Sequence, residues 1–162
     1  MPDTGVMSKE TRKLIVRRAI EWRKVASEQK DPFLRFIIEY IAFNALCRAK
    51  YGYGKRDGQL IEELKKDILK GTISPNKIKR LKELTPIKNV RNVHQNRRDS
   101  KVSIKDLDDY KNVIGAIYWI RNNLFHGDKR YSFERDQKLV EVGYEILLDI
   151  NDWLISENDS GE

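Results

Sequence analysis

The stretch PFLRFIIEYIAFNALCRAK, residues 32–50, decides the fold that this sequence is expected to take. Asp31 precedes it as a helix-capping side chain, and Pro32 suits the first helical turn. Apolar residues occupy most of the circumference of the resulting helix, so we predict that it is the central and most buried one. The sequence YGYG, residues 51–54, ends it.

Five more helices are predicted around this central helix. The first, at about residues 9–28, starts after the capping residue Ser8 and carries Ala19, Trp22 and Ala26 along its inward face. We predict an all-α fold, a helical bundle of four core helices with shorter helices in a central insertion and no strand. The other four helices are expected at about residues 59–69, 74–84, 103–126 and 133–154.

The length of 162 residues fits a single domain with one hydrophobic core. We predict one helical domain over residues 1–155, with a basic, variable insertion at about 52–103. A polar tail at 156–162 is expected to fray. Within the insertion, residues 85–100 show no periodicity, and a loop of that length in a small domain is either functional or disordered.

The positive charge of the chain is concentrated in its middle. The formal net charge is +7, and residues 74–105 carry ten basic side chains against two acidic ones. The rest of the chain is therefore nearly neutral. A concentrated basic segment suits a polyanionic partner such as nucleic acid. The alternative interpretation is a solvated loop without a partner, and charge alone does not decide between the two.

The composition excludes several classes of protein. Cys47 is the only cysteine, which excludes an internal disulfide framework and suits a reducing, cytoplasmic setting. With only two histidines, His94 and His126, a cysteine–histidine zinc site is not expected. No apolar run approaches the ~18 residues that span a bilayer, and residues 1–10 lack the apolar core of a secretory signal. We expect no metal, no cofactor and no membrane anchor.

Arg121 breaks the pattern of the helix predicted at about residues 103–126. On a helical wheel it lies within the apolar stripe that contains Ile117 and Ile120. A buried guanidinium is costly without a partner. One explanation is structural: an ion pair, for which Glu39 is a candidate partner, or a cap on a neighbouring helix. The other explanation is functional: an anion clamp at a cleft or at a subunit seam.

His126 follows five residues later, where this helix is expected to end before Gly127. The unpaired carbonyls and the negative end of the helix dipole favour an imidazolium there. Such a histidine titrates near neutral pH, as general acid–base catalysis requires. Asn122 lies one turn earlier on the same face and can orient the ring or bind a phosphate oxygen. The plainer interpretation of His126 is a helix cap.

The sequence RNNLFH, residues 121–126, resembles the arginine–four to six residues–histidine signature of HEPN domains, with the commonly preferred asparagine after the arginine. The flanking residues, YWI at 118–120 and GDK at 127–129, agree with this resemblance. The sequence FIIEYIAFNAL, residues 36–46, is similar to the aromatic-rich helix of HEPN families related to the Apea-like group. The resemblance covers the four core helices and leaves the insertion aside.

The resemblance implies a metal-independent endoribonuclease that acts as a homodimer in a toxin–antitoxin, defence or stress-response setting. Cleavage by the RNA 2′-hydroxyl needs a proton acceptor and a proton donor, and a two-fold axis would supply two copies of His126. The resemblance gives proton transfer to His126, charge stabilisation to Arg121 and positioning to Asn122. The alternative is a non-catalytic HEPN module that binds RNA, a nucleotide or a partner protein.

Further residues are candidates for binding or support. The resemblance also implies a protein partner, an antitoxin or a nucleotidyltransferase-type protein. Asp136 is expected in the first turn of the last helix, where a carboxylate is favourable, or in contact with the motif. Asn44 and Glu39 are either core polar groups or supports of the site. The candidates for RNA binding are Arg91, Arg97, Arg98, Lys129 and Arg130.

Overall fold

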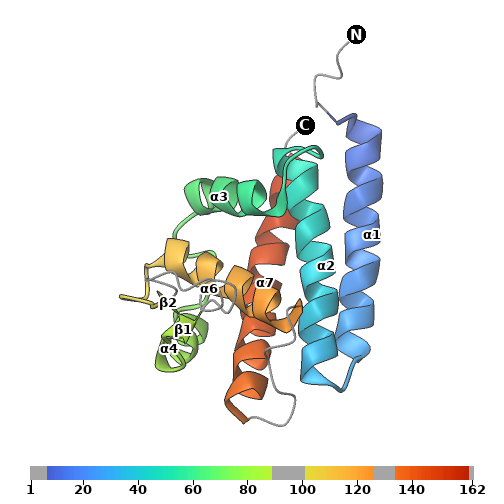
Figure 1. Ribbon diagram of the computed structural model, residues 1–162. Helices are drawn as coiled ribbons and strands as arrows, with labels where there is room; N and C mark the ends of the chain where they lie inside the picture. The colour runs from blue at the N-terminus through green and yellow to red at the C-terminus, as the bar shows by residue number, and fades with distance from the viewer. Residues whose placement is uncertain (1–6, 89–100, 126–133, 161–162) are drawn as a thin grey trace.

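The computed structural model describes residues 7–88, 101–125 and 134–160 (Figure 1). Within this part of the chain the predicted all-α helical bundle is confirmed. The elements are α1 (Lys9–Glu28), α2 (Pro32–Tyr51), α3 (Asp57–Asp67), α4 (Pro75–Glu83), β1 (Ile87–Lys88), β2 (Lys101–Val102), α6 (Tyr110–Phe125) and α7 (Glu134–Ser160).

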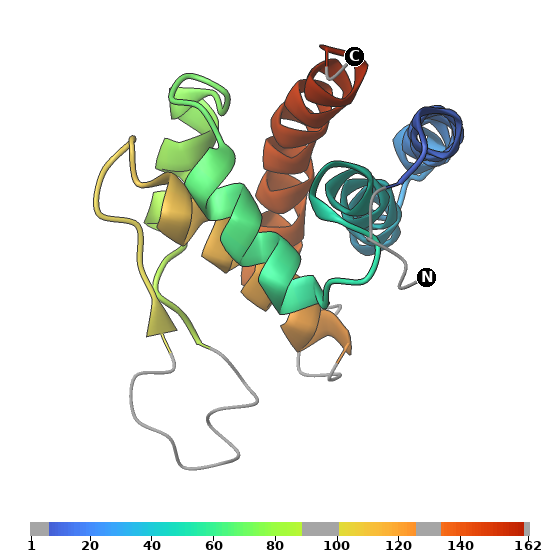
Figure 2. The same cartoon turned by 90° about the horizontal axis from the view of Figure 1, so that it is seen from above.

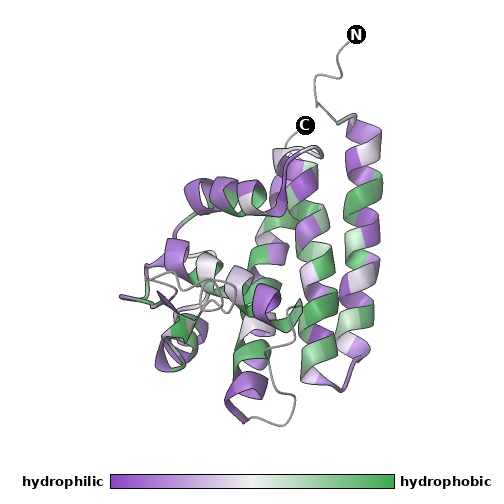
Figure 3. Ribbon diagram, in the orientation of Figure 1, coloured by the Kyte–Doolittle hydropathy of each residue, from purple (hydrophilic) through white to green (hydrophobic). Residues whose placement is uncertain are grey.

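The predicted central position of α2 is also confirmed. It packs between α1 and α7, and α3 and α6 lie on the side of α2 and α7 that faces away from α1 (Figures 1 and 2). Hydrophobic residues occupy much of α2 (Figure 3). Its rings form a continuous series, with 6.1 Å between the ring centroids of Phe36 and Tyr40 and 5.1 Å between those of Tyr40 and Phe43. The core is therefore built outward from this helix.

The first two helices begin at the capping residues that the sequence predicts. The Ser8 hydroxyl accepts a hydrogen bond from the Thr11 amide at 3.2 Å, and the Asp31 carboxylate accepts one from the Phe33 amide at 2.8 Å. Gly52 ends α2 with a φ of 126°, a backbone conformation that residues other than glycine rarely adopt. Local chemistry therefore fixes both ends of the central helix.

The inward face of α1 differs from the prediction. Ala19 and Ala26 are buried as expected, but Trp22 is exposed. Val16 is buried, and Arg23 reaches inward to a buried carboxylate described below. At about 100° per residue, Arg23 lies between Val16 and Ala19 on the wheel, and Trp22 lies beyond Ala26 on the opposite edge of this face.

Two predicted helix ends lie several residues from those in the structure. The helix expected from residue 103 begins at Tyr110, because Asp109 closes the preceding turn by accepting hydrogen bonds from the Lys105 amide and from Asn112 Nδ2, at 2.9 and 2.7 Å. At the other end of the chain, α7 continues to Ser160 instead of fraying at 156. Asn158 is buried there and donates to the Leu154 carbonyl oxygen at 2.8 Å.

The middle of the chain shares the core of the bundle. Buried side chains of α3 and α4 join the same hydrophobic cluster as α2, α6 and α7, among them Leu60, Leu64, Ile78 and Leu81. The unpredicted strands β1 and β2 pair antiparallel, with Ile87 opposite Val102. Among the described helices, none combines the length and the apolar composition that crossing a bilayer requires.

Candidate functional site

Arg121 lies in the last turns of α6 with its guanidinium between two aromatic rings. Its Cζ atom is 4.2 Å from the ring centroid of Phe125 and 5.6 Å from that of Tyr40 on α2. The side chain is 25% exposed. Contact with ring faces stabilises a cation and restricts its orientation. The guanidinium is therefore held in place while part of it remains accessible to solvent.

Asp57, the first residue of α3, provides the opposite charge. Its Oδ2 atom lies 3.5 Å from Arg121 Nη2. Arg121 Nη1 donates a hydrogen bond of 2.8 Å to Asn122 Oδ1, so the two predicted motif residues are in contact. Arg121 Nε is buried and has no acceptor among the described residues. A guanidinium has five N–H donors, and these two interactions leave some of them available for an anion.

Glu39, the candidate partner of Arg121 in the structural interpretation, is paired with a different arginine. Glu39 is fully buried on α2, and its Oε1 atom accepts a hydrogen bond of 2.8 Å from Arg23 Nε. Asn151 Nδ2 on α7 donates to the same oxygen at 3.1 Å. Glu39 and Tyr40 are consecutive, so their side chains point about 100° apart around the helix. Tyr40 therefore meets α6, and Glu39 meets α1 and α7.

Asn44 is close to the site, as one of its two interpretations proposed. Asn44 Nδ2 donates to Asp57 Oδ1 at 3.1 Å, and Arg48 Nη2 lies 3.4 Å from the same oxygen. The carboxylate of Asp57 thus connects α2, α3 and α6. Sequence reasoning missed Asp57 because it started this helix at Gln59. A carboxylate directly before an amphipathic stretch, where the helix dipole favours it, was the available signal.

Two buried protic groups beside the site stay neutral at physiological pH. Burial raises the pKa of the Tyr40 hydroxyl far above its usual value, although the charge of Arg121 acts in the opposite direction. Burial likewise raises the pKa of the Cys47 thiol, and the negative charge of Asp57 adds to this effect. Neither group can act as a general base near neutral pH, and Cys47 cannot act as a nucleophile.

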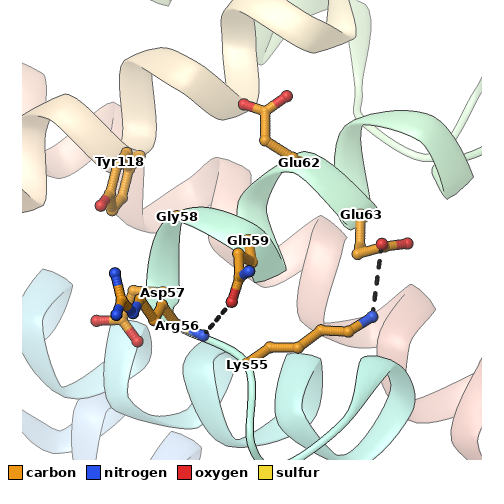
Figure 4. A pocket seen from close by; sticks show the side chains of 8 residues that line it. All are labelled: Lys55, Arg56, Asp57, Gly58, Gln59, Glu62, Glu63 and Tyr118. Carbon is orange, nitrogen blue, oxygen red and sulfur yellow. Dashed lines mark hydrogen bonds and ion pairs between the residues drawn. The ribbon is translucent and has the colours of Figure 1, made fainter.

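An open cavity of about 600 Å³, which Asp57 also lines, lies between α3 and α6 (Figure 4). Tyr118 reaches it from α6. Lys55 Nζ and Glu63 Oε1 lie 3.5 Å apart, and Gln59 Oε1 accepts a hydrogen bond of 2.9 Å from the Arg56 amide. Charges of both signs line this cavity, so it offers no net attraction to a phosphate.

Several predicted residues lie outside the described part of the chain. Asp136 is described, and it is buried in the first turn of α7. Among the described residues, no group of three or more histidine, cysteine, aspartate or glutamate side chains could hold a metal ion. The residues that lie outside the description are His126, Arg91, Arg97, Arg98, Lys129 and Arg130.

Comparisons with protein-family models, with curated proteins and with solved structures find no match. The function therefore has to be inferred from the arrangement around Arg121. That arrangement consists of a cation between two rings, tied to the carboxylate of Asp57 and to Asn122. Its chemistry suits the binding of a phosphate or a carboxylate.

Proposed function

We propose that this chain is a metal-independent endoribonuclease of the HEPN type, in which Arg121 binds the scissile phosphate. The observation that supports this proposal is the position of Arg121 near the end of α6, fixed by Tyr40, Phe125 and Asp57. Arginine is suited to this role because its planar guanidinium matches phosphate oxygens and keeps its charge. In the sequence, His126 comes directly after the last residue of α6.

The proposed reaction uses the RNA itself as the nucleophile. One His126 accepts the proton of a 2′-hydroxyl while the 2′-oxygen forms a bond to the adjacent phosphorus. The bond from phosphorus to the 5′-oxygen breaks, and a second His126 donates a proton to that leaving oxygen. Arg121 stabilises the charge that develops on the phosphate oxygens. The products carry a 2′,3′-cyclic phosphate and a 5′-hydroxyl.

The two histidines come from a homodimer in this proposal, because one chain supplies a single motif. A two-fold axis presents the same surface of both copies to each other, which would place two motifs around one phosphate. The basic residues Arg91, Arg97, Arg98, Lys129 and Arg130 are proposed to contact the RNA. We place this activity in the cytoplasm, in a toxin–antitoxin, defence or stress-response role with an antitoxin or a nucleotidyltransferase-type protein as partner.

RNA cleavage by the purified protein tests the proposal. A labelled single-stranded RNA incubated in EDTA should be cut at an unchanged rate, and mass spectrometry should find the cyclic phosphate on the product. His126→Ala should lower the rate at least about 100-fold, because it removes both proton transfers. His94→Ala, which changes the other histidine, serves as the matched control and should cleave as the unaltered chain does.

Dilution tests the composite site. The rate per chain should fall once the protein is diluted below the concentration at which sedimentation shows it to dissociate into monomers. Cleavage that EDTA abolishes, or that survives His126→Ala, would contradict the proposed mechanism. A rate per chain that is the same for monomer and dimer would contradict the composite site.

The ion pair with Asp57 favours a second candidate, a non-catalytic module that binds RNA, a nucleotide or a partner protein. An arginine that already has a carboxylate partner can have a purely structural role. This candidate predicts RNA binding that weakens steeply as salt rises, with no product formed. Product analysis of the same binding reactions separates the two candidates.

A further inference from the structure

A groove of about 280 Å³ runs between α1 and α2. Arg18 and Trp22 line it from α1, and Arg48 and Tyr53 line it from α2 and the turn that follows. The two aromatic residues are accessible: Trp22 is 44% exposed and Tyr53 is 63% exposed. The groove thus combines cations with exposed ring faces.

The charge of this groove is of one sign. Its remaining lining consists of apolar residues and Asn44, and none of the described residues that line it is acidic. Arg48 Cζ lies 5.7 Å from the ring centroid of Tyr53, so a cation and a ring already stand together. Arg48 Nε is buried without an acceptor among the described residues. The groove therefore offers donors and positive charge to an anionic ligand.

The groove is linked to the site around Arg121 by the side chain of Asp57. Asn44 and Arg48 line the groove, and both contact Oδ1 of Asp57, at 3.1 and 3.4 Å. The other oxygen of this carboxylate, Oδ2, lies 3.5 Å from Arg121 Nη2. Arg48 and Arg121 are therefore neighbours on either side of the Asp57 carboxylate. A chain of phosphates could therefore run from the groove to Arg121.

We propose that this groove binds single-stranded RNA on its way to Arg121, with bases stacked on Trp22 and Tyr53 and phosphates beside Arg18 and Arg48. This inference rests on the proposed function, because it names the path of its substrate. Positively charged grooves with exposed aromatic rings suit single-stranded nucleic acid, since every base has a face that can stack. Binding here is therefore expected to tolerate different base sequences.

A second copy of the chain is the competing occupant, and the charge of the groove argues against it. Around a two-fold axis the same surface meets itself. Arg18 would then approach its own counterpart with no carboxylate in the lining to compensate it. Among the described residues, Arg48 has only the carboxylate of Asp57, which it shares with Arg121. Burying like charges without partners is costly. Phosphate oxygens remove this cost.

Fluorescence anisotropy with a labelled single-stranded RNA tests the groove. Every protein in the series carries His126→Ala, so that the RNA stays intact during the titration. Adding Trp22→Ala should weaken binding about 5-fold or more, because a stacking platform is lost. Adding Trp22→Phe should restore most of the affinity, because a ring is present again. Ile20→Ala, at another exposed apolar residue of α1, is the matched control and should bind as the parent does.

Salt dependence tests the cations. Arg18→Ala should reduce the slope of the logarithm of affinity against the logarithm of salt concentration by about 0.7, the contribution of one phosphate on a single strand. Arg17→Ala removes the same charge from the neighbouring, exposed position of α1, which does not line the groove. Arg17→Ala should therefore change the slope less than Arg18→Ala does.

These outcomes separate the groove from the catalytic proposal. If Trp22→Ala and Arg18→Ala bind RNA as their controls do, the groove proposal is overturned, even when the unaltered chain cleaves RNA. If the unaltered chain cleaves nothing but the two variants lose affinity as expected, the groove stands and the proposed catalysis fails. A Trp22→Ala variant that dissociates a dimer and keeps its RNA affinity would identify the groove as an interface between copies instead.

Discussion

At the scale of single residues, the pair of Arg23 and Glu39 is costly to disturb. Glu39 is fully buried, and Arg23 is its cation. Arg23 also donates to Asp152 at 2.8 Å and to the Leu148 carbonyl oxygen at 3.3 Å, both on α7. The Oε1 atom of Glu39 on α2 is thus paired from α1 and hydrogen-bonded from α7, whereas its Oε2 atom is buried without a hydrogen-bond partner among the described residues.

We expect Arg23→Ala to lower the free energy of unfolding by about 3 kcal/mol, because it leaves a buried carboxylate without its cation. Glu39→Gln in the same chain should recover part of this loss, since a neutral amide is less costly to bury and can still accept from Asn151. Urea unfolding of the single and double variants measures the coupling. Strictly additive losses, or an Arg23→Ala loss as small as that of the exposed Arg17→Ala, would contradict this expectation.

The sequence identified Arg121 as an anomaly but could not name its partner. A helical wheel gives the direction of a side chain within its own helix, so the arginine on an apolar face was visible. The partner depends on how neighbouring helices are rotated and where they start, which the wheel does not contain. Glu39 is taken by Arg23, and Asp57 lies on a helix whose first turn was placed two residues too late.

At the scale of elements, α2 and α7 approach closely because Gly143 has no side chain. A Cβ atom placed there would be 2.8 Å from Phe36 Cε2 and 3.1 Å from Phe36 Cδ2. Gly115 on α6 provides a contrast, because the nearest atom to a Cβ there, Lys65 Nζ, would lie at 3.7 Å, an ordinary contact distance. One helical glycine is required by packing, and the other is not.

Alanine substitutions at these two glycines should change stability in opposite directions. Gly143→Ala should lower the free energy of unfolding, because overpacking costs about 1–3 kcal/mol and exceeds the gain in helix propensity. Gly115→Ala should raise the free energy of unfolding by about 0.5–1 kcal/mol, since it gains propensity without a clash. Chemical denaturation measures both. The packing argument fails if Gly143→Ala is as stabilising as Gly115→Ala.

The helices that could be predicted are those whose caps and apolar spacing agree. The caps Ser8 and Asp31 placed the starts of α1 and α2 correctly. The start of α6 differs from the expected residue 103 because the turn before the helix is closed by the side chain of Asp109. The end of α7 was wrong because the polar Asn158 is buried in a contact that only the tertiary structure provides.

At the scale of the whole molecule, the described helices share one hydrophobic cluster. Leu81 of α4 is fully buried within it, although α4 lies in the segment that the sequence marked as an insertion. The three tryptophans are outside that segment, on α1, α6 and α7. Tryptophan emission therefore reports on the bundle from helices other than α4.

Leu81→Ala should lower the midpoint of thermal unfolding of the whole protein, because deleting a buried leucine costs about 2–5 kcal/mol. Tryptophan fluorescence and far-ultraviolet circular dichroism should report the same lowered midpoint, as expected for a single cooperative transition. Leu69→Ala, at an exposed leucine, should leave the midpoint unchanged. A fluorescence midpoint that stays in place while the dichroism changes would show that α4 unfolds independently.

The carboxylate of Asp57 has a consequence for how any polyanion meets this protein. Its two oxygens face Arg48 and Arg121, so each cation already has an internal counterion. An incoming phosphate must compete with that counterion instead of meeting a bare charge. When a phosphate displaces the Asp57 carboxylate from one arginine, the carboxylate remains paired with the other arginine. The ion pairs of Arg48 and Arg121 are therefore coupled. Under the proposed function, Asp57 therefore moderates attraction to small phosphates and favours a ligand that makes contacts besides charge.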